Sequence, residues 1–87
     1  MELIGQVRTD EPEALASRTA KHFAHKVPVE EVDGTTTIET RLGTISLEPR
    51  DGSLHVRLAG DDVERLRAVA ASHLERFARG RFEMHWR

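Results

Sequence analysis

Hydrophobic positions along the chain follow two different periods. In six short segments apolar and polar residues alternate, which is typical of strands with one buried and one solvated face. In two longer segments apolar residues recur every three or four positions, as they do along one side of an amphipathic helix. The pattern predicts eight elements in the order β-α-β-β-β-β-α-β.

Turn signals set the boundaries of the predicted strands. Asp33-Gly34 and Asp51-Gly52 are typical of two-residue hairpin loops, because these residue types tolerate positive φ. A further turn is expected at 41–43. The predicted strands cover residues 2–8, 27–32, 35–40, 44–49, 53–59 and 81–87. The residues expected to face the core from the last two strands are Leu54, Val56, Leu58, Phe82, Met84 and Trp86.

The first predicted helix follows Asp10, which forms a candidate capping box with Glu13. The helix is expected to end near His25 or Lys26, because Pro28 disfavours helical geometry in the residue before it.

The second predicted helix lies within residues 60–80. Asp61 and Glu64 form its candidate capping box, and Gly80 is placed to end it. Its apolar stripe consists of Val63, Leu66, Ala70, Leu74 and Phe77.

These elements predict a single α+β domain over residues 1–87. The expected architecture is a two-layer sandwich: a mostly antiparallel sheet with both helices on its apolar face. The two Asp-Gly hairpins exclude a helical bundle, and two helices are too few for a doubly wound sheet.

Composition and charge remove several classes of function. The chain has no cysteine, which excludes disulfides, thiolate metal sites and cysteine nucleophiles, and fits a reducing compartment. The net charge is −2, and the six arginines of residues 61–87 are nearly balanced by acidic residues, so no nucleic-acid surface is expected. No apolar run approaches the roughly 20 residues of a membrane span, and no secretory signal is evident. A cytoplasmic location is expected.

Enzymatic motifs are absent from the sequence. There is no G-x-S-x-G nucleophile motif, no P-loop and no G-x-G-x-x-G stretch after a strand. The sequence does not support catalysis.

Histidines carry the candidate chemistry. His22 and His25 lie three positions apart near the end of the first helix, so both imidazoles could reach one ion. The alternative is that they are cationic groups at a helix C-terminus. His73 lies inside the apolar stripe of the second helix, where its ring needs a hydrogen-bond partner or an ion.

A metal site arises if the two helices lie side by side. His73 would then join His22, and with Glu30 or Glu75 the pair would suit Zn²⁺ or Fe²⁺. The candidate metal ligands are therefore His22, His25 and His73. Haem would need a histidine axial ligand, and the thin core argues against an internal haem pocket.

The outer sheet face is the other candidate surface. His55 and His85 are expected there among arginines and glutamates. This face is interpreted as a solvated array of cross-strand ion pairs, or as a docking surface for a protein partner or an anionic ligand. Edge strands are natural surfaces for homodimer formation.

Three stretches together resemble a known family: "KHFAHKVPVE" (21–30), "LGTISLE" (42–48) and "HLERFARGRFEMHW" (73–86). They are similar to a family of small bacterial domains known as domain of unknown function 2218. The resemblance implies an association with siderophore-interacting proteins, and thus with iron handling, but it implies no catalytic residue. The family's motif positions correspond to His22, His25, Lys26, Pro28, His73, Arg76 and Phe77.

The sequence thus predicts a non-enzymatic binding or accessory module, linked to iron or siderophore handling, that holds a divalent metal, a chelate or a metalloprotein partner near the two helices. The alternative is a ligand-free interaction domain that dimerises or docks through the exposed sheet face or a sheet edge.

Overall fold

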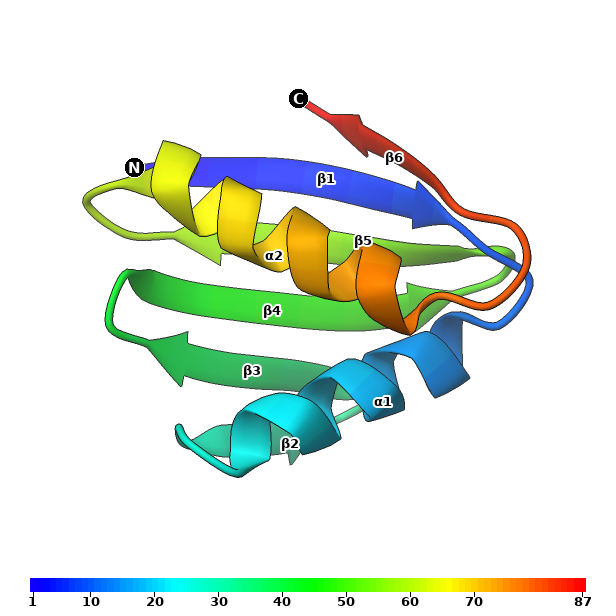
Figure 1. Ribbon diagram of the computed structural model, residues 1–87, viewed down its shortest axis with the longest axis horizontal. Helices are drawn as coiled ribbons and strands as arrows, with labels where there is room; N and C mark the ends of the chain where they lie inside the picture. The colour runs from blue at the N-terminus through cyan, green and yellow to red at the C-terminus, as the bar shows by residue number, and fades with distance from the viewer.

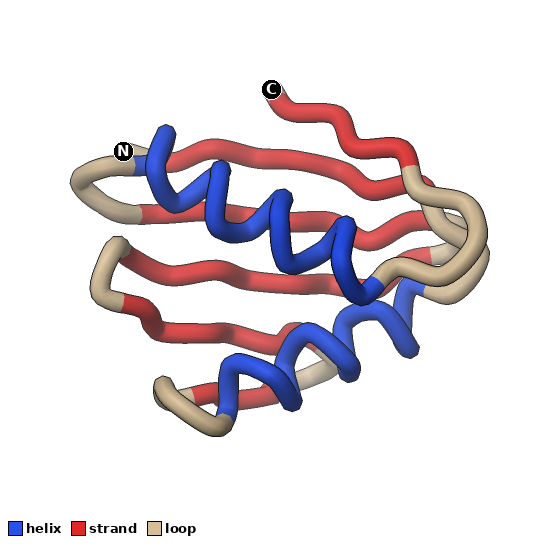
Figure 2. The backbone as a smooth tube through the Cα atoms, viewed as in Figure 1, coloured by secondary structure: helices blue, strands red, loops and turns tan.

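Two helices lie across one face of a six-stranded antiparallel sheet in the computed structural model, which describes residues 1–87 (Figure 1). Both helices are on the same side of the sheet, and its other face has no helix over it (Figure 2). The strands are β1 (Glu2–Arg8), β2 (Val29–Val32), β3 (Thr35–Thr40), β4 (Gly43–Arg50), β5 (Ser53–Ala59) and β6 (Glu83–Trp86), and the helices are α1 (Pro12–Ala24) and α2 (Val63–Phe77). The predicted fold class and element order are confirmed. Neither helix is long and apolar enough to cross a membrane.

The sheet has the strand order β2-β3-β4-β5-β1-β6, so the first strand lies between the fifth and the last. Both predicted Asp-Gly hairpins form. In the first, Asp33 and Gly34 have φ values of 52° and 83°, the geometry of a two-residue loop that matches the twist of the strands. The edge strands are shorter than predicted, because β2 begins only at Val29 and β6 ends at Trp86.

The core lies between the helices and the sheet. On β5, Leu54, Val56 and Leu58 are at most 1% exposed, whereas Arg57 between them is exposed, which confirms the predicted alternation. Full burial of one such side chain stabilises the fold by about 1.5–3 kcal/mol. The buried cluster consists of Val7, Leu15, Ala16, Ile38, Ile45, Leu47, Leu54, Val56, Leu58, Leu66, Ala70 and Leu74, and the predicted inward residues Phe82, Met84 and Trp86 pack against it.

The helix termini differ from the predicted ones. The expected capping box of Asp10 and Glu13 does not form: the N-cap of α1 is Glu11, and no side chain caps the helix. The Thr9 hydroxyl accepts a hydrogen bond from the Glu11 amide at 3.2 Å. The helix then begins with Pro12, one residue later than a cap at Asp10 would give.

The predicted capping box of α2 is wrong by one residue. Asp62, not Asp61, is the N-cap, and its carboxylate accepts a hydrogen bond from the Arg65 amide at 3.1 Å. The helix also ends at Phe77 and not at Gly80, because Ala78 already has extended geometry (φ −70°, ψ 143°).

Arg18 fixes the two helices to each other. Its Nε donates to the carbonyl oxygen of Phe77 at 2.8 Å, and its Nη2 donates to the carboxylate of Glu11. The Arg18 hydrogen bond lowers the pKa of Glu11 from its ordinary value. One arginine on α1 therefore contacts the last residue of α2 and links the two helices.

Candidate functional site

Four aromatic rings from the two helices meet where α1 and α2 lie side by side. The ring centroids of His22 and His73 are 5.1 Å apart, those of Phe23 and His73 4.6 Å, and those of His22 and Phe77 5.1 Å. The rings of these three pairs are tilted against each other by 38–49°, and those of His22 and Phe23 meet edge-on at 83°, all favourable aromatic contacts. We refer to His22, Phe23, His73 and Phe77 as the ring cluster.

His73 has one ring nitrogen committed and one free. Its Nδ1 lies 2.8 Å from the carbonyl oxygen of Val69. Because a carbonyl only accepts, Nδ1 carries the proton and donates it. In the neutral ring the lone pair is therefore on Nε2, and no protein hydrogen bond occupies it. This bond supplies the partner that a partly buried histidine requires.

Burial of the His22 ring favours its neutral form. The pKa of His22 is lowered from 6.5, first by this burial and then by electrostatic interactions with His73, Arg76, Lys26 and His25. At neutral pH the imidazole of His22 therefore keeps a lone pair available to a ligand.

The structure brings together two of the three predicted metal ligands. His25 is the exposed C-cap of α1, and it is not part of the ring cluster. Glu30 lies on the opposite side of the sheet, because its neighbour Val29 pairs with the buried Ile38 and alternate side chains point to opposite faces. No group of three or more His, Asp or Glu side chains is close enough together to hold an ion. A metal bound to His22 and His73 would therefore be only partly coordinated by the chain.

A hollow of about 250 Å³ adjoins the two imidazoles. It lies where α1 and α2 meet the turn between β3 and β4. We call it the imidazole pocket, and its lining consists of His22, Phe23, Lys26, Val27, Thr40, Arg41, Leu42, Val69 and His73. The sequence did not indicate that Arg41 and Leu42 belong to it, because they lie in a turn of ordinary composition.

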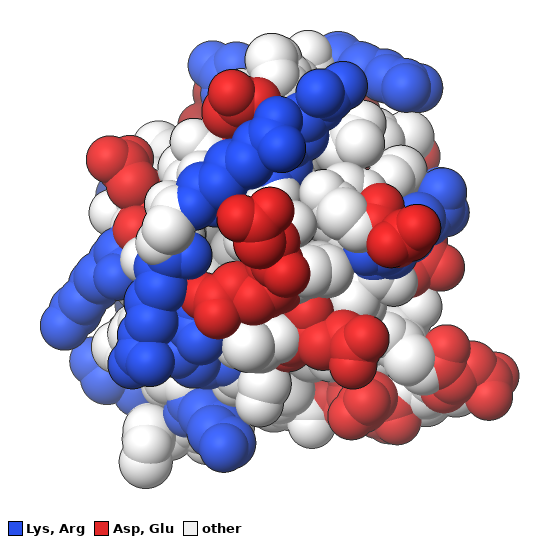
Figure 3. Space-filling model, turned by 90° about the vertical axis from the view of Figure 1, so that its right-hand side faces the viewer, with Lys and Arg blue, Asp and Glu red and all other residues white.

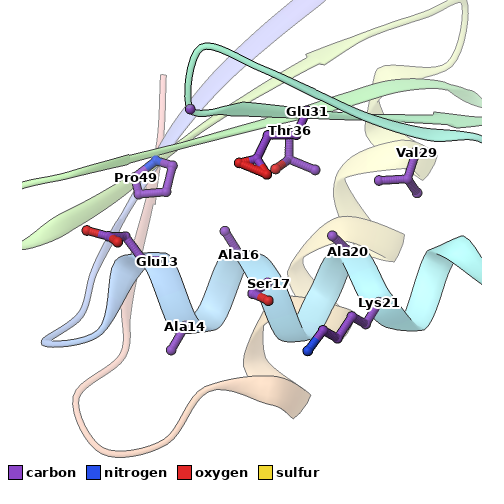
Figure 4. Close-up of a pocket in the computed structure, with 11 residues that line it drawn as sticks. Glu13, Ala14, Ala16, Ser17, Ala20, Lys21, Val29, Glu31, Thr36 and Pro49 are labelled. Atoms are coloured by element: carbon purple, nitrogen blue, oxygen red, sulfur yellow. The ribbon is translucent and has the colours of Figure 1, made fainter.

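A larger hollow of about 720 Å³ lies between α1 and strands β2 and β3. Figure 4 shows Ala16 and Ala20 pointing from α1 toward Thr36 and Glu31, while Ala14 and Lys21 lie on the other side of the helix. On the α1 side the lining includes the small side chains of Ala14, Ala16 and Ala20. None of the predicted site residues lines it.

The outer sheet face carries His55 in a row of polar residues. Across the strands, His55 pairs with Glu48 on one side and with Gln6 on the other, and Gln6 also pairs with His85. The pKa of His55 is lowered, first by partial burial and then by the charge of Arg50, with Glu48 opposing the shift.

Of the cross-strand ion pairs predicted for this face, one is present. Arg57 on β5 contacts Glu2 on β1 at 3.8 Å, whereas Arg50 contacts Glu48 of its own strand β4 at 2.7 Å, and all four side chains are about half exposed. At the end of the molecule where β1 leads into α1, basic and acidic side chains likewise lie in adjacent groups (Figure 3).

The fold has a counterpart among solved structures. The NMR structure of PA4090 from Pseudomonas aeruginosa superimposes with a TM-score of 0.77 at 26% identity, over 99% of this chain and 94% of the other. No curated protein matches the chain. Residues 5–87 match the family described as "Uncharacterized protein conserved in bacteria (DUF2218)", which confirms the resemblance seen in the sequence. The chain therefore belongs to this uncharacterised bacterial family.

Proposed function

We propose that this domain is a non-enzymatic binding module that holds a divalent metal ion, Zn²⁺ or Fe²⁺, between His22 and His73. The observation that carries the proposal is the 5.1 Å separation of the two ring centroids. Imidazole nitrogens bind zinc at about 2.0–2.1 Å, and two rings bound at a tetrahedral angle have centroids about 5 Å apart. The observed separation therefore suits a shared ion.

The hydrogen bond of His73 supports the same role. Metal-binding histidines almost always donate their second ring N–H to a carbonyl or carboxylate, which fixes the tautomer and directs the other nitrogen at the ion. The bond from Nδ1 of His73 to the Val69 carbonyl has this arrangement. His22 supplies the second neutral imidazole.

Two protein ligands leave the ion open to further donors. Because no third His, Asp or Glu is close enough to join the pair, the remaining positions would be filled by water or by a bound chelator. This favours an accessory module that receives a metal already bound to a small molecule, in line with the iron-handling association that the family resemblance implied. We place this role in the cytoplasm, because a chain without cysteine fits a reducing compartment.

Metal titration of untagged protein tests the proposal. Zn²⁺ is titrated by calorimetry into the wild type and into a His22→Ala, His73→Ala variant, and Fe²⁺ is titrated under anaerobic conditions. The matched control is His55→Ala, His85→Ala, which removes two imidazoles from the opposite face. We expect a loss of affinity of tenfold or more in the first variant and none in the control. Equal affinity in all three proteins would refute the metal site.

One observation favours a second function, docking through a sheet edge. β2 is an outer strand, and its Val32 is 55% exposed. Unpaired backbone groups on such an edge can pair with a second chain. The edge is only four residues long, which limits the strength of such pairing. Sedimentation over a concentration series tests this function, and a monomer at every concentration with no partner in pull-down experiments would oppose it.

A further inference from the structure

The charges around the imidazole pocket are all of one sign. Its nine lining residues include two cations, Lys26 and Arg41, and two imidazoles, but no Asp or Glu. Neither cation takes part in any of the five ion pairs of the structure, which use other arginines. Five of the eleven arginines form these pairs, so unpaired cations are common on this molecule; Lys26 and Arg41 are distinguished by lining one hollow that has no acidic residue. The pocket is electrostatically complementary to an anion.

The rest of the lining is apolar. Phe23, Val27 and Leu42 are partly buried and pack against the hydrophobic core, and Val69 contributes a further aliphatic wall from α2. A ligand that covered these side chains would remove apolar surface from water, which stabilises a complex in proportion to the area. The hollow of about 250 Å³ is smaller than the roughly 300–1,000 Å³ typical of pockets for drug-sized molecules. Its size thus favours a small organic ligand.

We infer that the imidazole pocket binds a small organic carboxylate, with its anionic group at Lys26 and Arg41 and its apolar body against Phe23, Leu42 and Val69. A guanidinium and an ammonium both form charge-assisted hydrogen bonds to a carboxylate, and these bonds are stronger than neutral ones. The inference deepens the proposed function, because it concerns the ligand class of the same pocket. It rests on different residues, because the carboxylate is bound by Lys26 and Arg41, whereas the metal is bound by His22 and His73.

The carboxylate has two possible sources, a free organic acid or an acid group of a metal chelate. In both cases the anion would lie beside the positive charges of Lys26 and Arg41.

Benzoate and the metal-free protein provide the test. Benzoate is titrated into ¹⁵N-labelled protein stripped of metal, and benzamide, its neutral analogue, is titrated in parallel. We expect benzoate to shift the amide resonances of Phe23, Leu42 and Val69, and benzamide to bind at least fivefold more weakly. A Lys26→Gln, Arg41→Gln variant should lose benzoate binding at least fivefold. The control Lys21→Gln, Arg65→Gln makes the same change in net charge with exposed cations outside the pocket and should bind as the wild type does.

The outcomes separate this inference from the metal proposal. Equal binding of benzoate and benzamide, or unchanged benzoate binding in the Lys26→Gln, Arg41→Gln variant, would overturn the carboxylate site whatever the metal titration gives. The metal proposal is tested separately, by titrating Zn²⁺ without benzoate into the His22→Ala, His73→Ala variant. Repeating the benzoate titration with Zn²⁺ present distinguishes the sources: tighter binding indicates a carboxylate that reaches the ion, and equal binding indicates a free acid.

Discussion

At the scale of single residues, Gly5 is a position where the fold depends on the lack of a side chain. Gly5 pairs with Trp86 across β1 and β6, and the indole ring lies over it. A Cβ at Gly5 would lie 2.5 Å from Cε3 of the Trp86 ring, far inside van der Waals contact. An aromatic ring that covers a glycine on the neighbouring strand gives the outer strand β6 an apolar contact with the sheet.

Gly5→Ala is therefore expected to push Trp86 away from β1. The added methyl overpacks the contact, and we expect the free energy of unfolding to fall by about 1–3 kcal/mol. Tryptophan emission should shift to the red as the only indole of the chain becomes more exposed. Urea denaturation and fluorescence measure both effects. Gln6→Ala, at the next position on β1 and on the other side of the sheet, is the control, and a Gly5→Ala protein that matches it in both properties would contradict this account.

At the scale of elements, the start of α2 separates two adjacent aspartates that look equivalent in the sequence. Only Asp62 accepts a backbone hydrogen bond, from Arg65. We expect Asp62→Ala to lower the free energy of unfolding by about 1 kcal/mol, as loss of an N-cap does, and Asp61→Ala to change it by a few tenths at most. Urea denaturation of the two variants side by side measures the difference. Equal losses would mean that helix-dipole interactions, and not the cap, stabilise this terminus.

The same aspartates show what local pattern can and cannot predict. Alternation identified the buried face of β5 correctly, because the period of two follows from strand geometry alone. Asp62 is the N-cap because α2 begins at Val63, whose side chain is 6% exposed. The burial of Val63 depends on packing against the sheet. Patterns therefore predicted the elements, and tertiary packing decided their ends.

In the candidate site, too, local pattern predicted one part and tertiary packing decided the other. The helical stripes predicted that His22 and His73 would meet if the helices lay side by side, and the rings do meet. Arg41 was missed because the β3–β4 turn is positioned by contacts distant in sequence. Gly43, at the end of that turn, lies directly against the backbone of Ala59 and Gly60. No local pattern reveals such a backbone approach.

At the scale of the whole molecule, two histidines on opposite faces couple stability to pH. The pKa of His22 on the helix side and that of His55 on the outer sheet face are both lowered from 6.5, in each case mainly by burial. The unfolded chain takes up these protons near the ordinary value, whereas the folded molecule takes them up only at lower pH. Between the two values the unfolded state binds more protons, so the free energy of unfolding must fall as pH falls.

We expect the free energy of unfolding to change little with pH above about 7, where both rings are neutral in both states, and to decline below about 6.5. Urea denaturation between pH 5.5 and 7.5 measures this dependence and stays clear of the carboxyl groups, including Glu11, whose pKa lies below its ordinary 4.5. A His22→Gln, His55→Gln variant should flatten the decline. The control His25→Gln, His85→Gln removes two exposed imidazoles and should retain it. A wild-type protein that grows more stable between pH 7 and 5.5 would show that protonated imidazoles stabilise the fold, and that burial does not govern these two rings.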